Sequence, residues 1–229
     1  MIQIYCDGPT LEELKTFDRD LVRGFTFNPT LFRSLGVSNY LEHCREIVKH
    51  CGSLPVSLEV IADDPKEMLR QAAILGALGG NVYVKIPITY TSGESTLAVI
   101  SQLVQQKVKL NITAVFTKKQ VEHILPTLRD TQSIISVFAG RLYDLGINAV
   151  EVVKTITTLV HAEGQCLVLW ASPRMVYDVK SASEAQCDII TMQMSLIKKI
   201  SFFKKSPETY SLETVKMFYQ DAMASGYSF

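Results

Sequence analysis

Lys85 is the residue whose position says most about chemistry. It closes the run Val82-Tyr83-Val84, which is β-branched and aromatic and carries no charge, and Pro87 follows shortly after it. Because proline cannot donate to a β-ladder, a strand would stop there and leave the lysine at its carboxyl end, in or beside the core. Burial disfavours the ammonium form of a lysine, and a neutral amine can attack a ketone to form a Schiff base. The alternative is a lysine that extends from the strand end into water.

Other apolar runs also end in polar residues, and their types are complementary. Two carboxylates could transfer protons, two amides could bind sugar hydroxyls, and two arginines with a serine hydroxyl could hold a phosphate. These residues are Asp7 and Glu59, Asn28 and Asn111, and Arg141, Arg174 and Ser172, with Thr113 and Phe138 at two of the same strand ends.

Each of these residues also has a purely structural interpretation. The alternatives are an Asp7 cap on a helix near Thr10, a Glu59–Lys85 ion pair, an Arg141–Asp144 ion pair and a helix start at Ser172-Pro173. Polar groups near a core must find partners, so a polar residue at almost every strand end is a costly pattern for a purely structural protein. Their joint placement favours one shared site.

The elements that must position these residues alternate regularly. Eight strand candidates start about 20 to 32 residues apart, which leaves room for a helix after each. We predict strands at 2–7, 24–27, 56–59, 82–85, 109–113, 134–138, 165–169 and 189–192, and helices near 11–14, 39–50, 64–68, 117–128 and 149–161. This pattern predicts a parallel sheet, and at this length a single α/β domain over 1–229, a (β/α)8 TIM barrel. A doubly wound open sheet is the alternative, but the sequence has no glycine-rich GxGxxG or Walker loop to support it.

Composition excludes several other classes of protein. Apolar residues make up 47% of the 229 residues and the formal net charge is zero, so the chain is globular and has no global field for nucleic acid or an anionic membrane. It has no apolar run of membrane-spanning length, and the first residues lack the basic region of a signal peptide. Five scattered cysteines without a CxxC motif and four histidines without ligand spacing indicate reduced thiols in a cytoplasmic protein, with no metal site.

The polar strand ends belong to segments that resemble the transaldolase family, in its compact branch of short transaldolases and fructose-6-phosphate aldolases. Seven segments occur in the family's order over roughly residues 1–195. They are Tyr5-Cys6-Asp7, Gly24-Phe25-Thr26-Phe27-Asn28-Pro29, Val56-Ser57-Leu58-Glu59-Val60, Val84-Lys85-Ile86-Pro87, Asn111-Ile112-Thr113, Ser136-Val137-Phe138-Ala139-Gly140-Arg141-Leu142 and Ala171-Ser172-Pro173-Arg174.

The resemblance implies a class I mechanism without metal or cofactor. Lys85 would form the Schiff base with a ketose phosphate, and Asp7 would take the proton of the C4 hydroxyl as the C3–C4 bond breaks. Glu59 and Thr113 would hold a water that relays protons. Asn28 and Asn111 would orient the dihydroxyacetone fragment, and Arg141, Ser172 and Arg174 would hold the phosphate of the sugar substrates.

Within this family, one pair of positions separates transfer from aldol cleavage. Fructose-6-phosphate aldolases carry Gln and Tyr there, whereas transaldolases carry Glu and Phe, as this chain does with Glu59 and Phe138. The resemblance therefore implies a transaldolase. The alternatives are an aldolase that releases free dihydroxyacetone, a Schiff-base aldolase with another donor, and an inactive barrel that binds sugar phosphates.

Three positions depart from the usual family pattern. Phe27 stands where Thr is usual, Gly8-Pro9 follows the aspartate in place of a small hydroxyl residue or alanine, and Pro173 replaces Phe or Ile. These differences bear on the acceptor preference and the pocket shape.

The C-terminal segment 201–229 is a helical tail rich in aromatic residues, with an amphipathic helix expected at 214–224. The resemblance implies a homo-oligomer, a pentamer or decamer, in which such a helix packs on a neighbouring subunit. A helix that closes its own barrel is the alternative.

Overall fold

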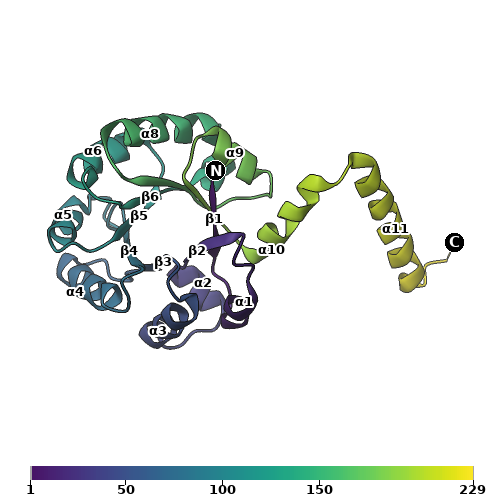
Figure 1. Ribbon diagram of the computed structural model, residues 1–229, viewed down its shortest axis with the longest axis horizontal. Coiled ribbons are helices and arrows are strands. Elements are labelled where there is room, and N and C mark those ends of the chain that lie inside the picture. The colour runs from purple at the N-terminus through teal and green to yellow at the C-terminus, as the bar shows by residue number, and fades with distance from the viewer. Residues whose placement is uncertain (1, 229) are drawn as a thin grey trace.

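Eight parallel strands close into a barrel in the order in which they occur along the chain (Figure 1). The structure is a computed structural model that describes residues 2–228. Each strand pairs with the next, and β8 closes the barrel against β1. The strands are β1 Gln3–Asp7, β2 Val22–Thr26, β3 Val56–Glu59, β4 Val82–Pro87, β5 Leu110–Val115, β6 Ile134–Val137, β7 Leu167–Trp170 and β8 Ile189–Met192. The predicted TIM barrel is confirmed.

Helices in the connections surround the barrel (Figure 1). Local capping explains where several of them start. Asp64 caps α4 and Pro65 is its first residue, while Thr117 and Gln120 form a capping box on α6. The helices are α1 Leu11–Thr16, α2 Pro29–Ser34, α3 Tyr40–Cys51, α4 Pro65–Gly76, α5 Leu97–Gln105, α6 Lys118–Leu128, α7 Ala139–Asp144, α8 Ala149–Glu163, α9 Asp178–Glu184 and α10 Met194–Ile197.

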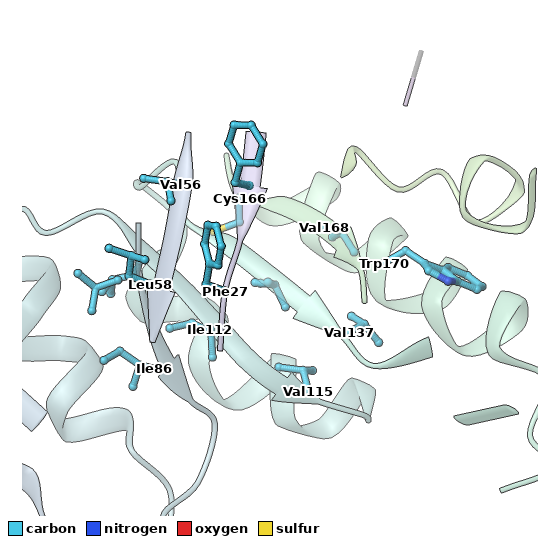
Figure 2. Packing of buried hydrophobic residues seen from close by; sticks show 14 of the residues in the cluster. Phe27, Val56, Leu58, Ile86, Ile112, Val115, Val137, Cys166, Val168 and Trp170 are labelled. Atoms are coloured by element: carbon cyan, nitrogen blue, oxygen red, sulfur yellow. The ribbon is translucent and has the colours of Figure 1, made fainter. Parts of the chain in front are cut away.

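Successive side chains of each strand point to opposite faces of the barrel wall. One set belongs to the outer core, between the strands and the surrounding helices, and the other set fills the inside of the barrel. On β4, Val84 and Ile86 belong to the large core between strands and helices, whereas Tyr83 packs with the smaller cluster that contains Tyr5 and Leu169. Figure 2 shows part of the outer core, with Ile86 near Leu58 and Ile112. Since successive strand residues point to opposite faces, Lys85 faces the barrel interior.

Five strands end one or two residues away from the predicted positions. β5 and β7 run on to Val115 and Trp170, and the other three are β2, β4 and β6. β2 ends at Thr26 and β6 at Val137, although the next amides, of Phe27 and Phe138, still donate to neighbouring strands, at 2.9 and 2.8 Å. β4 continues to Pro87, which lacks an N–H, because the amide of the next residue, Ile88, still donates to the Thr113 carbonyl of β5 at 3.0 Å. Lys85 is thus inside the strand rather than its last residue.

The C-terminal segment leaves the barrel. A 3-10 helix, Lys198–Lys204, leads into α11, Pro207–Ser225, which stands away from the rest of the molecule at the yellow end of Figure 1. None of the α11 residues is buried. The helix expected at 214–224 is therefore part of a longer one, and the interpretation that it closes its own barrel is wrong. Within residues 2–228, no helix is both long and apolar enough to cross a membrane.

Candidate active site

Lys85 is held inside the barrel by two acceptors. Its Nζ donates to the carbonyl oxygen of Phe27 at 3.0 Å and lies 2.9 Å from the Glu59 carboxylate. The residue is 6% exposed, so the interpretation of a lysine that extends into water is wrong. The predicted internal ion pair with Glu59 is present. A buried amine beside a carboxylate has a nearby group with which to exchange a proton.

Asp7 lies in the same interior and has an unusual proton affinity. Burial raises the pKa of its carboxyl group; the Lys85 ammonium and a hydrogen bond from Thr26 oppose this effect, and the Glu59 carboxylate adds to it. The Thr26 hydroxyl donates to Oδ1 at 2.6 Å. Asp7 does not cap α1, because Thr10 is the N-cap and forms a capping box with Glu13. The carboxyl group is therefore free of helix capping and can serve as a proton acceptor.

Asn111 is fixed by two serines from neighbouring strands. Its Nδ2 donates to Ser57 Oγ at 3.0 Å, and Ser136 Oγ donates to its Oδ1 at 2.7 Å. All three side chains are buried. The amide was expected to bind substrate hydroxyls, and in this structure its orientation is set by strands β3 and β6.

A cavity of about 100 Å³ opens among the carboxyl ends of the strands. Seven of the ten predicted site residues line it. The lining is Asp7, Thr26, Asn28, Lys85, Thr113, Ser136, Phe138, Arg141, Leu169, Ala171, Ser172 and Thr191. Glu59 reaches this group through its ion pair with Lys85, and Asn111 through its hydrogen bond to Ser136.

The hydroxyl group of Thr113 is available to form a hydrogen bond. Its side chain is buried, and its Oγ1 has no hydrogen-bond partner within residues 2–228. A buried hydroxyl normally has a partner, so this group is a candidate to bind substrate or a water molecule. The next residue, Ala114, has φ +58° at a β-bulge, after which the side chains of β5 resume their alternation with Val115 in the outer core.

The rim beyond Phe138 brings the start of helix α7 into close contact with the loop that follows β7. A Cβ on Gly140 would lie 1.5 Å from the Ser172 carbonyl oxygen, so only glycine fits there. Ser172 has φ +60°, and it does not start a helix, because α9 begins at Asp178. The Arg141 guanidinium lies 5.1 Å from the centre of the Phe138 ring, over its face.

Arg174, like Glu59 and Asn111, lies outside the lining of the cavity. Its guanidinium pairs with Asp144, so the structural alternative of an ion pair between Arg141 and Asp144 is wrong. The carboxylate of Asp178 accepts from the backbone amides of Arg174 and Met175 at 2.6 and 3.0 Å and so fixes the loop. The arginine is exposed, and its side chain is long enough to be redirected toward the rim.

Asn28 has a second role that the sequence did not predict. Its Oδ1 accepts the amide of Leu31 at 3.0 Å and caps α2, which leaves the side-chain NH2 as a donor. Next to it, the Phe27 ring packs outward on Phe32, with ring centroids 5.7 Å apart. The unusual phenylalanine therefore lies in the outer core and does not shape the cavity.

Gly8 has φ +58°, and a Cβ there would meet the Leu31 side chain at 2.6 Å.

Three polar residues of the lining were given no role in the site from the sequence: Thr26, Ser136 and Thr191. Each faces inward near the carboxyl end of a strand, and each side chain is buried. Their position in the alternation was the available signal, but threonine and serine are also ordinary residues of a strand. Within the described residues there is no group of three or more His, Cys, Asp or Glu side chains that could hold a metal ion.

Comparison with known proteins agrees with this arrangement. The sequence model of the family Transaldolase/Fructose-6-phosphate aldolase matches residues 4–227. The chain belongs to this family. This confirms the family expected from the seven segments. The protein is an enzyme of the transaldolase family.

Relatives in the transaldolase family cover nearly the whole chain. A protein of Thermoplasma volcanium named "Probable transaldolase" is 32% identical over 90% of this chain and 91% of its own. Another with the same name from Brucella melitensis is 31% identical over 93% and 94%. Among solved structures, the deoxyribose phosphate aldolase of Aeropyrum pernix has a TM-score of 0.59 at 12% identity over 87% of this chain and 89% of its own. That likeness shows the fold alone.

Proposed function

We propose that the protein is a transaldolase that transfers a dihydroxyacetone unit from a ketose phosphate, fructose 6-phosphate or sedoheptulose 7-phosphate, to an aldose phosphate. The observation that carries this proposal is the buried Lys85 amine, 2.9 Å from the Glu59 carboxylate in a cavity that Asp7 also lines. Membership of the transaldolase family supports it. An inactive binding barrel would not need a nucleophile, a base and a proton shuttle in one interior.

The first step is attack of the neutral Lys85 amine on the ketose carbonyl. The ammonium gives a proton to Glu59, the nitrogen adds to C2, and the carbinolamine loses its oxygen as water to give the Schiff base. Glu59 can return the proton to the departing oxygen through a water that the free Thr113 hydroxyl would help to hold.

Cleavage follows when Asp7 accepts the proton of the C4 hydroxyl. The C3–C4 bond breaks, its electron pair passes into the protonated Schiff base, and the aldose phosphate leaves. The remaining three-carbon enamine stays bound to Lys85. An acceptor aldose phosphate then enters, the enamine attacks its aldehyde, and Asp7 returns the proton to the new hydroxyl. Water then adds to the resulting Schiff base, which releases the new ketose phosphate and the Lys85 amine.

We assign the phosphate groups of the donor and acceptor sugars to the rim of the cavity. Arg141 and Ser172 line the cavity there, and Arg174 would join them after exchanging Asp144 for the phosphate. A guanidinium can bind a phosphate through two parallel hydrogen bonds, which is stronger than one exposed ion pair with a carboxylate.

The presence of Phe138 and Glu59 favours transfer over release of free dihydroxyacetone. A phenyl ring cannot help place the water that would protonate the enamine and hydrolyse the Schiff base. A panel of donors with and without aldose phosphate acceptors tests this proposal. We expect transfer products at a much higher rate than free dihydroxyacetone. Release of dihydroxyacetone without acceptor, at a rate equal to transfer, would identify an aldolase instead.

We also propose that the protein is a homo-oligomer in which α11 packs against a second copy of the chain. Large apolar residues on this helix are exposed, among them Leu212, Val215 and Phe218, and the helix stands apart from its own barrel (Figure 1). Light scattering of the full chain should give a multiple of the 25.6 kDa subunit mass. Val215→Asp with Phe218→Asp should reduce that multiple, and a monomeric wild type would contradict the proposal.

A further inference from the structure

Two threonine hydroxyls meet across strand β1 beside the Asp7 carboxylate. Thr26 is on β2 and Thr191 is on β8, the two strands that flank β1. Their Oγ1 atoms are 2.5 Å apart, and Thr26 Oγ1 is 2.6 Å from Asp7 Oδ1. Thr26 is 2% exposed and Thr191 is 4% exposed, and both line the cavity. A chain of hydroxyl groups therefore leads from β8 to the carboxylate.

When Asp7 is ionised, the number of protons on the two hydroxyl groups determines the direction of both hydrogen bonds. A threonine hydroxyl has one proton to donate and two lone pairs to accept with, and a carboxylate only accepts. Thr26 gives its proton to Asp7, so it must accept the proton of Thr191. Thr191 is thus the first donor of the chain, and Asp7 is its final acceptor.

We propose that Thr191 is a positioning residue that acts on Asp7 through Thr26 and so holds the carboxylate in its ionised form, ready to accept the substrate's proton. The inference deepens the proposed function, since it rests on Asp7 as the proton acceptor. It adds a residue on β8, a strand that contributes none of the seven family segments on which the resemblance was based.

The physical reason is cooperativity in a dry environment. A hydrogen bond to a carboxylate is charge-assisted, and a hydroxyl that itself accepts a hydrogen bond becomes a stronger donor. Burial opposes ionisation of Asp7, so its remaining stabilising partners matter more. The charged groups around Asp7 are Lys85 on β4, Glu59 on β3 and Arg141 on α7, and a change at Thr191 leaves all three in place.

Thr191→Val tests the proposal by removing the terminal donor while keeping nearly the same volume. Thr191→Ser keeps the hydroxyl and is the matched variant. Because a valine methyl is too large for a 2.5 Å contact, Thr191→Ala provides a second variant without the hydroxyl. Thr157→Val is the control for a buried threonine elsewhere, since the Thr157 hydroxyl donates to the Val153 carbonyl within α8.

The primary measurement is the titration of the Asp7 carboxyl carbon by NMR, with the resonance assigned by its absence from Asp7→Asn. Loss of one hydrogen bond should raise the pKa of Asp7 by about half a unit to one unit in the valine and alanine variants. We expect no change in the serine variant or in Thr157→Val. An unchanged pKa of Asp7 in both folded variants without the hydroxyl would overturn the proposal.

A second measurement separates this inference from the proposed function. The acid limb of the pH profile of kcat for transfer should move upward by the same amount as the Asp7 titration, while KM for the donor at alkaline pH stays within about twofold. A shifted NMR titration with an unmoved activity profile would uphold the link between Thr191 and Asp7. It would contradict the proposed role of Asp7 as the proton acceptor.

Discussion

Glu59 and Lys85 stand opposite each other on adjacent parallel strands, and their side chains form an ion pair of 2.9 Å inside the barrel. The pairing is built into the strand register, because the same two residues are Cα partners of β3 and β4. A charged lysine in this interior depends on that carboxylate, and the same contact provides a path for the proton that must leave the amine before it can attack a carbonyl.

Glu59→Gln should therefore affect both stability and catalysis. It leaves the buried ammonium with neutral partners, and we expect a loss of about 1.5–3 kcal/mol in the free energy of unfolding. Urea denaturation measures this loss. Replacing Lys85 by Met in the same variant should recover part of it, because the unpaired charge is gone. A double variant that is less stable than Glu59→Gln would contradict the account.

Arg141→Ala and Arg174→Ala should weaken the binding of phosphorylated sugars. If each arginine makes charge-assisted hydrogen bonds to the phosphate, KM should rise by a factor that corresponds to about 1.5–3 kcal/mol. Steady-state kinetics with phosphorylated and unphosphorylated acceptors provides the measurement. Arg45→Ala is the matched control, because Arg45 pairs with Glu42 on the exposed surface of α3. Equal losses with both kinds of acceptor would argue against phosphate recognition.

Phe138→Tyr should move the reaction toward release of free dihydroxyacetone. The ring lines the cavity that Thr113 also lines, so the added hydroxyl could share a water molecule with the Thr113 Oγ1, which has no hydrogen-bond partner within residues 2–228. The measurement is the ratio of dihydroxyacetone released without acceptor to transfer product with acceptor. A parallel thermal melt detects any cost of overpacking by one oxygen. An unchanged ratio in a folded variant would show that this position does not control the outcome.

Asp7→Asn should change the pH dependence of stability. Burial raises the pKa of Asp7 in the folded protein, so over a window above about pH 4, the ordinary value for this side chain, the folded state binds this proton more tightly than the unfolded chain. The contribution of Asp7 to stability is then largest in acid and falls as pH rises through that window. Asparagine cannot ionise, so the Tm of the variant relative to wild type should increase from acid to neutral pH. A difference that stays flat with pH would mean that the Asp7 pKa is unshifted.

The fold and much of the candidate site follow from local sequence features. Alternating residues and capping signals such as Asp64-Pro65 predict the strands and helices, and polar residues at or near strand ends, such as Asp7 and Lys85, identify the cavity. The partners of those residues depend on contacts between distant segments. The pair of Arg174 with Asp144 could not be read from spacing, because it depends on how the segments after β6 and β7 pack on each other. The contact of Thr26 with Thr191 arises only when the barrel closes between β8 and β1.

The central claim is that Lys85 forms the Schiff base, and reductive trapping tests it most directly. Wild type treated with fructose 6-phosphate and sodium borohydride should gain a covalent adduct, and peptide mass spectrometry should place it on Lys85. Lys85→Ala should give no adduct while keeping its thermal transition. Lys109→Ala is the control, because the Lys109 amine donates to the Gly80 carbonyl, and this variant should be labelled like wild type. An adduct on a different lysine, or no adduct in the folded wild type, would contradict the account.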